Sequence, residues 1–462
     1  MLSTVLTPAN TSSCNPVRVS IGKVTTAPPW GFPEWFLIAQ MALPALLYLP
    51  GTNAFRVPIR IAPFAISLLG FLALPTKSSP LTAAHPARRW LLCVLACLAL
   101  MVFHPTTNSY LAGAAQAMLY LCVILPLFWV PYLVRNPAHL ARLLFILLFC
   151  NGINAVVGIL QVYDPDRWMP AELSKVILGA YDIGSLSYTR WDGRVIIRPP
   201  GLSDNPGAVC GPSMIAAMLG LGFCASPISL RKKLIGLAFA LAGVVAIYLT
   251  HVRTSLLILA GSMLVYGWVL LMQRNWRRAL WFYVILGVIA FVSFSGALLL
   301  GGDSIVNRFA TLLEGDPITV YYSAQRGQQL EAAFTKYAMD YPFGAGLGRW
   351  GMMRYYFGDS RNRLSPALWA ELQVPAWILD GGLILMTLYC LALISTTVYE
   401  YRLARWNRSN LRSWAAIVFA INVGTLGLIF GYTPFTTQVG LQYWFLAGAL
   451  AGAARGNAQG QR

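Results

Sequence analysis

Charged residues are scarce in this chain. Only 11% of its 462 residues are Asp, Glu, Lys or Arg, whereas 57% are hydrophobic and the mean hydropathy is +0.61. A soluble domain carries about 25% charged residues. The composition therefore excludes an ordinary soluble protein and predicts an integral membrane protein, folded as one polytopic helical bundle.

Disulfide and metal-ligand patterns are also missing. All of the eight cysteines except Cys14 fall within or at the ends of apolar runs, and no CxxC or Cys/His spacing occurs. The longest polar stretch, 301–371, contains no histidine. We therefore expect no disulfide framework, no metal centre and no cofactor.

Acidic residues are fewer than basic ones, with 16 Asp and Glu against 34 Lys and Arg, which gives a net charge of +18. Such an excess also occurs in proteins that bind nucleic acid. Here the basic residues lie mostly in short loops between apolar runs, without interleaved aromatic residues. Because cytoplasmic loops of membrane proteins are rich in Lys and Arg, the charge indicates orientation, and no nucleic-acid partner is expected.

The apolar runs predict an all-α polytopic membrane protein with about twelve transmembrane helices. Each run is near the roughly 20 residues that cross the hydrocarbon core as a helix. Helix-compatible stretches in the polar loops predict a partly helical cap over the bundle. The expected spans are 34–50, 60–76, 88–104, 110–133, 141–162, 206–227, 233–250, 252–272, 279–300, 374–399, 413–431 and 436–454.

The distribution of Lys and Arg predicts that both termini are cytoplasmic, although Arg56 and Arg60 depart from the positive-inside pattern. The first thirty residues lack the apolar core of a signal peptide, so the run near Trp35 is expected to be an uncleaved anchor. The predicted parts are a cytoplasmic segment (1–33), transmembrane helices (34–162), a first large outer loop (163–205), central transmembrane helices (206–300), a second large outer loop (301–371), C-terminal transmembrane helices (372–454) and a cytoplasmic tail (455–462).

Two arginines are expected at the outer membrane face. Arg198 precedes two prolines and a glycine, which position it, and Arg253 lies close to His251 in a short link between two apolar runs. A guanidinium suits bidentate contact with phosphate oxygens. An ionisable residue at the membrane is costly and indicates function by default. The alternative is an interfacial arginine that snorkels to the headgroups of membrane lipids.

The loop 301–371 holds the remaining candidates. Its glycine run at 344–348 permits tight turns and close backbone approach, but it does not match a P-loop. Glu371 precedes a helix that Pro375 should help to start, and its carboxylate could take a proton from an attacking hydroxyl. The alternative for Glu371 is a salt bridge to Arg361 or Arg363. Asp380 is expected to be structural, pairing with a loop arginine or capping the backbone.

The order of these features resembles the O-antigen ligase/polymerase superfamily, whose shared region is called the Wzy-C domain. The features are Arg-x-x-Gly…Asn-Pro at 198–206, Arg-Thr-Ser at 253–255, Pro-Phe-Gly-Ala-Gly-Leu-Gly at 342–348 and acidic-x-Gly at 380–382. Gln161 also matches a frequent glutamine of the family. The resemblance covers roughly residues 150–395.

The resemblance implies a GT-C-like glycosyltransferase fold in the inner (cytoplasmic) membrane of a bacterium, with both outer loops periplasmic. Members take a glycan from undecaprenyl pyrophosphate, without a metal, and pass it to lipid A–core, to another lipid-linked repeat or to protein. By this resemblance the donor pyrophosphate is bound by Arg198, Arg253 and Arg326. Candidates for binding the sugar or the acceptor are Arg349, Arg361, Arg363 and Trp350.

One position departs from the ligase pattern. Ligases carry a His-Asn pair shortly before the acidic-x-Gly motif, and the matching position here is Glu371, followed by Leu372. Because a carboxylate can also serve as a base, we predict an inverting polysaccharide polymerase, with an O-antigen ligase as the alternative. A chain-length regulator is a further partner expected for a polymerase. Three more functions stay open: a protein O-oligosaccharyltransferase, a lipid-linked sugar transporter and a non-catalytic scaffold.

Overall fold

The computed structural model describes residues 27–73, 85–173, 186–189, 192–301, 326–407 and 411–460. These residues are mostly helical. The only sheet among them is a short antiparallel hairpin of β1 (Ser187–Thr189) and β2 (Val195–Ile197). The predicted all-α architecture is therefore confirmed.

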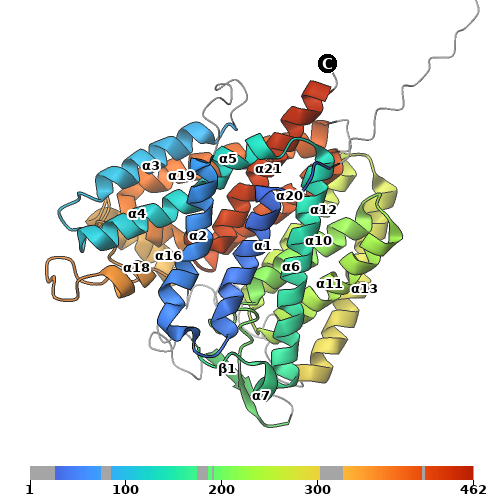
Figure 1. The fold of residues 1–462 in the computed structure, drawn as a ribbon, viewed down its shortest axis with the longest axis horizontal. Coiled ribbons are helices and arrows are strands. Elements are labelled where there is room, and N and C mark those ends of the chain that lie inside the picture. Colours follow the sequence, from blue (N-terminus) through green and yellow to red (C-terminus); the bar gives the residue numbers. More distant parts are fainter. Residues whose placement is uncertain are drawn as a thin grey trace, which may run out of the picture.

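Long helices form the body of the molecule (Figure 1). They are α1 (Phe32–Ala45), α2 (Arg56–Leu72), α3 (Arg88–Met101), α4 (Tyr110–Ile124), α5 (Pro126–Leu133), α6 (Pro137–Tyr163), α10 (Cys210–Ala225), α11 (Leu230–Leu249), α12 (Arg253–Met272), α13 (Trp276–Gly301), α19 (Gln373–Trp406), α20 (Leu411–Gly427) and α21 (Gln438–Gly460). Shorter elements connect them: η1 (Leu46–Tyr48), η2 (Thr52–Phe55), α7 (Pro165–Trp168), α16 (Gln328–Ala332), η4 (Ala333–Tyr337), α17 (Ala338–Asp340), α18 (Gly351–Phe357), η5 (Leu428–Phe430) and η6 (Pro434–Thr436).

Seven helices of the described residues are long and apolar enough to cross a membrane, fewer than the twelve spans predicted. In the described residues, each of the twelve predicted runs overlaps a helix, and residues 74–76 of the second run lie outside that part of the chain. However, α1, α2, α3 and α10 contain 14, 17, 14 and 16 residues, short of the 18 required of a candidate span. The helix α21 is long but ends in a polar stretch. The seven are Tyr110–Leu133, α6, α11, α12, α13, α19 and Leu411–Phe430.

The helices are arranged as a bundle with two distinct ends. Helix α10 packs on α6 and α11, α19 packs on α3 and α20, and α21 packs on α5. In Figure 1, α11 and α13 form one side of the bundle, and α3, α4 and α19 form the other. The hairpin and α7 lie at one end, and the C-terminal end of α21 lies at the opposite end (Figure 1).

Part of the polar segment before α19 is helical and packs against the bundle. Residues 328–340 form a nearly continuous helical stretch, α16 to α17, which includes one turn of π-helix, η4. The prediction that this segment is partly helical is therefore confirmed. One face of this stretch buries Ala333 and Ala338 against Ile378 of α19, so apolar packing anchors the segment to the bundle.

Candidate active site

Four of the predicted site residues line a single cavity. The cavity has a volume of about 1210 Å³. Its wall includes Arg198, Arg253, Arg326 and Glu371, which come from separate parts of the chain. A cavity of this size, with several convergent polar groups, is the kind of site in which proteins bind ligands.

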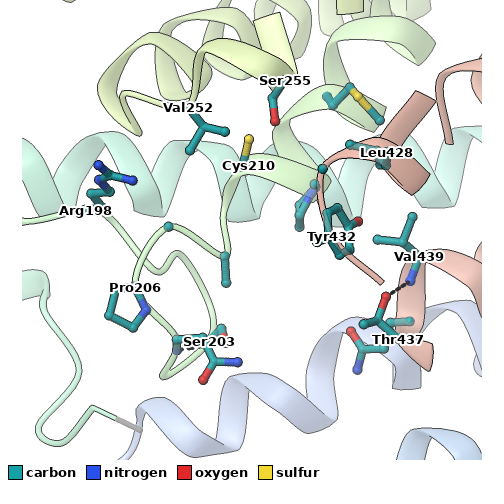
Figure 2. A pocket seen from close by; sticks show the side chains of 18 of the residues that line it. Arg198, Ser203, Pro206, Cys210, Val252, Ser255, Leu428, Tyr432, Thr437 and Val439 are labelled. Carbon is teal, nitrogen blue, oxygen red and sulfur yellow. Dashed lines mark hydrogen bonds between the residues drawn. The ribbon is translucent and has the colours of Figure 1, made fainter. Parts of the chain in front are cut away.

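Three long helices begin at this cavity. The residues Cys210, Arg253 and Gln438 start α10, α12 and α21, and all three line the cavity wall. Figure 2 shows Cys210 near Ser255, which lies in the first turn of α12. The first backbone N–H groups of a helix have no partner within it and carry partial positive charge. The cavity is therefore suited to an anion even before its arginines are counted.

Arg198 is held by the loop that follows β2. Its backbone N–H donates to the carbonyl of Leu186 at 2.9 Å, and its carbonyl accepts from Gly207 N–H at 3.1 Å. The loop is fixed to α6 by Gln161, whose side-chain amide exchanges two hydrogen bonds with the backbone of Gly201, at 2.8 and 2.9 Å. Gly201 has a φ of +64°, and a Cβ there would lie 2.0 Å from Asn154 Oδ1. The glycine of the Arg-x-x-Gly motif is thus required for the loop to approach α6.

Arg253 is the first residue of α12 and is half-buried. The residue two positions before it, His251, has a φ of +57°, which is unusual for a residue other than glycine. The His251 ring packs against the ring of Tyr188 of β1, with the two centroids 3.8 Å apart. This contact joins the loop before α12 to the hairpin that leads to Arg198, so the two arginines are placed by one connected structure.

Arg326 and Glu371 lie at the two ends of the described segment before α19. The Gln329 side chain donates from Nε2 to Glu371 Oε2 at 3.2 Å, which ties these ends together. Arg326 Nη1 lies 3.5 Å from where a Cβ on Gly431 would be, in the connection between α20 and α21. Arg326 therefore lies against the side of the cavity that is formed by the C-terminal helices.

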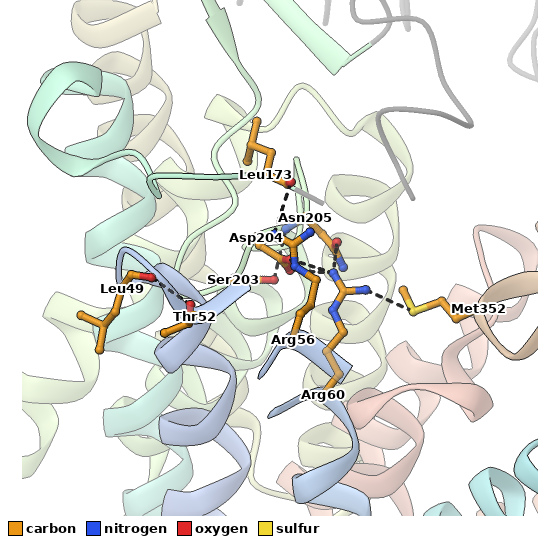
Figure 3. Close-up of polar contacts among 9 residues, drawn as sticks. All are labelled: Leu49, Thr52, Arg56, Arg60, Leu173, Ser203, Asp204, Asn205 and Met352. Atoms are coloured by element: carbon orange, nitrogen blue, oxygen red, sulfur yellow. Dashed lines mark hydrogen bonds and ion pairs between the residues drawn. The ribbon is translucent and has the colours of Figure 1, made fainter. Parts of the chain in front are cut away.

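The structure adds two arginines that sequence analysis did not select. Arg56 and Arg60, both on α2, point toward the buried Asp204 (Figure 3). Arg56 Nε lies 3.0 Å from Asp204 Oδ2, and Arg60 Nη2 lies 2.8 Å from Oδ1 and 2.9 Å from Oδ2. Arg60 also donates to Asn205 Oδ1 at 3.0 Å and lines the cavity.

These contacts explain the departure of Arg56 and Arg60 from the positive-inside pattern. Both arginines are partly buried, and the carboxylate of Asp204, in the loop before α10, compensates their charge. That departure was the sequence signal that could have identified Arg60 as part of the site. When Arg60 is included, four arginines line the cavity. Two carboxylates, Asp204 and Glu371, line it as well.

The glycine run has a structural role, which involves a break in α19. Helical φ and ψ angles are interrupted at Gly381 and Gly382, and Gly382 has a φ of +68°. The helical bond from Leu383 N–H to the Leu379 carbonyl is replaced: Leu383 N–H donates to Pro342 O at 3.0 Å, and Leu379 O accepts from Ala345 N–H at 2.7 Å. We call the paired segments 342–348 and 379–383 the glycine joint. It satisfies the backbone groups that the helix break exposes.

Asp380 lies in the glycine joint and is fully buried. Its Oδ2 accepts from Tyr120 at 2.8 Å and from Gln116 at 3.2 Å, both on α4, and its Oδ1 accepts from Trp350 Nε1 at 2.8 Å. The carboxylate therefore connects α4, α19 and the polar segment. The structural role expected for Asp380 is confirmed, but the partners in these bonds are a phenol, an amide and an indole rather than a loop arginine.

The four candidates for sugar or acceptor binding lie outside the cavity wall. Arg349 is only 3% exposed and donates to the carbonyls of Ala345 and Pro366, at 3.0 to 3.2 Å. Burial lowers the pKa of the Arg349 guanidinium from its usual value. Trp350 is buried against Asp380, as described. By contrast, Arg361 and Arg363 are exposed after α18.

Among the described residues, no group of three or more His, Cys, Asp and Glu side chains is placed to hold a metal ion. In comparisons with known proteins, no protein-family model and no curated protein matches this chain. The resemblance found from motifs therefore stays a prediction.

Proposed function

We propose that the protein is a metal-independent inverting glycosyltransferase with a GT-C-like bundle. In this proposal it transfers a glycan from an undecaprenyl-pyrophosphate donor to an acceptor hydroxyl at the periplasmic side of a bacterial inner membrane. The observation that carries the proposal is that Arg198, Arg253 and Arg326 line one cavity together with Glu371. A pyrophosphate leaving group needs clustered cations, and an attacking hydroxyl needs a base.

The charges of the wall suit a pyrophosphate. Asp204 is engaged by Arg56 and Arg60, both on α2. Arg198 and Arg253 lie beside the positive ends of α10 and α12. Together these groups would stabilise the negative charge that grows on the leaving group as its bond to the sugar breaks.

The apolar part of the wall suits a lipid-linked donor. Met41, Pro44 and Leu47 line the cavity from the region of α1 and η1, and Leu257 and Leu428 line it from α12 and η5. These side chains belong to a helical bundle that contains seven helices long and apolar enough to cross a membrane. A ligand with a charged head and a long polyprenyl chain would match both parts of the wall.

The proposed reaction is a direct displacement. The acceptor hydroxyl oxygen attacks the anomeric carbon from the face opposite the pyrophosphate, and Glu371 takes the hydroxyl proton. The bond from the anomeric carbon to the phosphate oxygen breaks, the new glycosidic bond forms with inverted configuration, and undecaprenyl pyrophosphate leaves with the electron pair. The hydrogen bond from Gln329 holds the Glu371 carboxylate in place.

Polymerisation of lipid-linked repeat units is our first candidate among the related reactions. The residue that lines the cavity at the position of the ligase histidine is Glu371, a carboxylate. Transfer to lipid A–core is the second candidate. Arg361 and Arg363, exposed outside the cavity, are proposed to contact the glycan of the acceptor, whereas Arg349 and Trp350 would act by holding the segment in shape.

The proposed orientation places the cavity end of the bundle in the periplasm and both termini in the cytoplasm. The helices α10 and α12 run from the cavity to segments rich in Lys and Arg, at 231–233 and 274–278, near the starts of α11 and α13. Such segments favour the cytoplasmic side. Labelling of single cysteines from either side of the membrane tests this orientation.

Purified protein with synthetic undecaprenyl-pyrophosphoryl oligosaccharide tests the activity. We expect longer lipid-linked chains and released undecaprenyl pyrophosphate, with no added metal. Product that forms only after lipid A–core is added would identify a ligase. Movement of the donor across a vesicle membrane without a new glycosidic bond would identify a transporter and refute the proposed reaction.

A further inference from the structure

A second cavity lies at the other end of the bundle. Its volume is about 570 Å³, and it is bounded by the C-terminal end of α10, the first turns of α11 and the first turns of α13. Because α10 and α12 begin at the large cavity and run away from it, this second cavity is at the opposite membrane face. It is separate from the proposed active site.

Two cations flank the second cavity without a local carboxylate. Lys233 of α11 and Arg278 of α13 both line it. The sequence contains no Asp or Glu between Asp204 and Asp303, so α10 to α13 supply no acidic partner. Neither cation forms an ion pair with a carboxylate in the part of the chain that the structure describes. An anion in the cavity would be attracted by both cations.

The remaining wall of this cavity is apolar and faces outward. Leu234 of α11 and Trp281 of α13 line it and are 56% and 67% exposed. Only 17% of the most apolar part of α13 is buried within the protein, the smallest share among the seven candidate spans. An apolar helix with so little protein contact has its surface against lipid chains. The cavity is therefore open toward the membrane.

We propose that this cavity binds an anionic phospholipid. The lipid phosphate would lie between Lys233 and Arg278, near the positive ends of α11 and α13. One acyl chain would follow Leu234 and Trp281 along the groove between the two helices. Basic residues above an apolar groove match a ligand with an anionic head and an acyl chain, whereas a free phosphate would leave the apolar wall uncovered.

The neighbouring cations provide a matched control. Lys232 lies with its Nζ over the Phe145 ring at 5.7 Å, and Arg277 lies over the Trp276 ring at 5.6 Å. Neither of them lines the cavity. The double variants Lys233→Gln/Arg278→Gln and Lys232→Gln/Arg277→Gln therefore remove the same charge from the same helix starts, but only the first removes it from the cavity.

Native mass spectrometry of the full chain, titrated with phosphatidylglycerol, tests the proposal. We expect the affinity to fall roughly thirtyfold in Lys233→Gln/Arg278→Gln, about fivefold for each cation, and much less in the control pair. If the first variant does not fold, each single variant is expected to show its fivefold loss. Phosphatidylcholine is expected to bind weakly to all the proteins.

Equal losses in the two double variants would overturn the proposal, because they would indicate diffuse attraction to the basic surface. Displacement of phosphatidylglycerol by inorganic phosphate at comparable concentration would also overturn it, since the acyl chain would then contribute nothing. The measurement needs no glycosyl transfer, so its outcome is independent of the proposed enzymatic function.

Discussion

Two carboxylates near the start of α19 have opposite surroundings. Glu371 is half-buried, accepts a hydrogen bond from Gln329 and lines the large cavity. Asp380 is fully buried in the glycine joint, where three donors from Gln116, Tyr120 and Trp350 surround it. One carboxylate is therefore accessible to a ligand, and the other is occupied by the protein itself.

The polar segment before α19 therefore contributes both to the proposed catalytic cavity and to the hydrogen bonds that hold the fold together. Glu371 lines a cavity that a substrate can enter. In the glycine joint, hydrogen bonds to the protein connect α4, α19 and the segment before it. Substitutions in the two regions should therefore change different measurements, catalysis in one and folding in the other.

The largest effect is expected for Glu371→Gln. This variant keeps the size and the hydrogen-bonding capacity of the side chain but removes the base, so turnover should fall by about 10²–10⁴-fold. Donor affinity should persist, because the arginines remain. Turnover of lipid-linked oligosaccharide and a donor-binding titration measure the two quantities.

Glu331→Gln is the matched control for Glu371→Gln. Glu331 lies on α16 in the same polar segment, but it is exposed and does not line the cavity. Its turnover should equal that of the unchanged protein. Near-normal turnover of Glu371→Gln would remove Glu371 from the mechanism.

Gly382→Ala tests the glycine joint. A Cβ at this position would lie 2.1 Å from Pro342 O, and the φ of +68° is unfavourable for alanine. We expect a loss of about 3 kcal/mol in the free energy of unfolding, seen as a lower midpoint of thermal unfolding. Gly261→Ala on α12 is the control, since a Cβ there meets no atom within 4 Å. Equal midpoints for the two variants would show that the joint contributes little.

Arg198→Ala and Arg253→Ala should each weaken donor binding about tenfold to hundredfold, the loss expected for a hydrogen bond to a charged group. A thermal unfolding curve of each variant shows whether it remains folded, so that a loss of affinity can be assigned to the site. Arg167→Ala on α7 removes an exposed arginine that does not line the cavity and should leave donor affinity unchanged. Unaltered affinity in both cavity variants would refute the pyrophosphate site.

The smallest effect concerns pH and His104, which lies in the connection between α3 and α4. Partial burial and the charge of Arg349 lower the pKa of His104 from 6.5. The unfolded chain then binds this proton more readily than the folded chain, so stability is present above pH 6.5 and is lost as the pH falls below that value. We expect His104→Asn to flatten the dependence of the unfolding midpoint on pH between about 7 and 5. An unchanged dependence would exclude His104 as its source.

Much of the helical framework could be predicted from the sequence, because helix formation in a membrane depends on local runs of apolar residues. In the described residues, all twelve predicted runs overlap helices. The number of spans was overestimated, since hydropathy alone does not show where a helix ends. The helix α1, for example, continues only as far as Ala45, one residue beyond Pro44.

The candidate site was predicted in part. The sequence selected Arg198, Arg253, Arg326 and Glu371 individually, and the structure places all four on one cavity. It missed Arg60, because the pairing of α2 with Asp204 joins residues far apart in the chain. It also grouped Arg349 with the binding candidates, although the Arg349 side chain is buried against carbonyl groups.

The sequence by itself determined the class of the protein and the inventory of its charges: an apolar helical bundle with a few arginines in constrained positions. Only the tertiary structure decided which of those charges share a cavity and which are enclosed by protein. The physical reason is that hydropathy and helix boundaries depend on neighbouring residues, whereas a cavity forms where the ends of distant helices meet. The exposure of a side chain such as Glu371 or Asp380 depends on how those helix ends pack together.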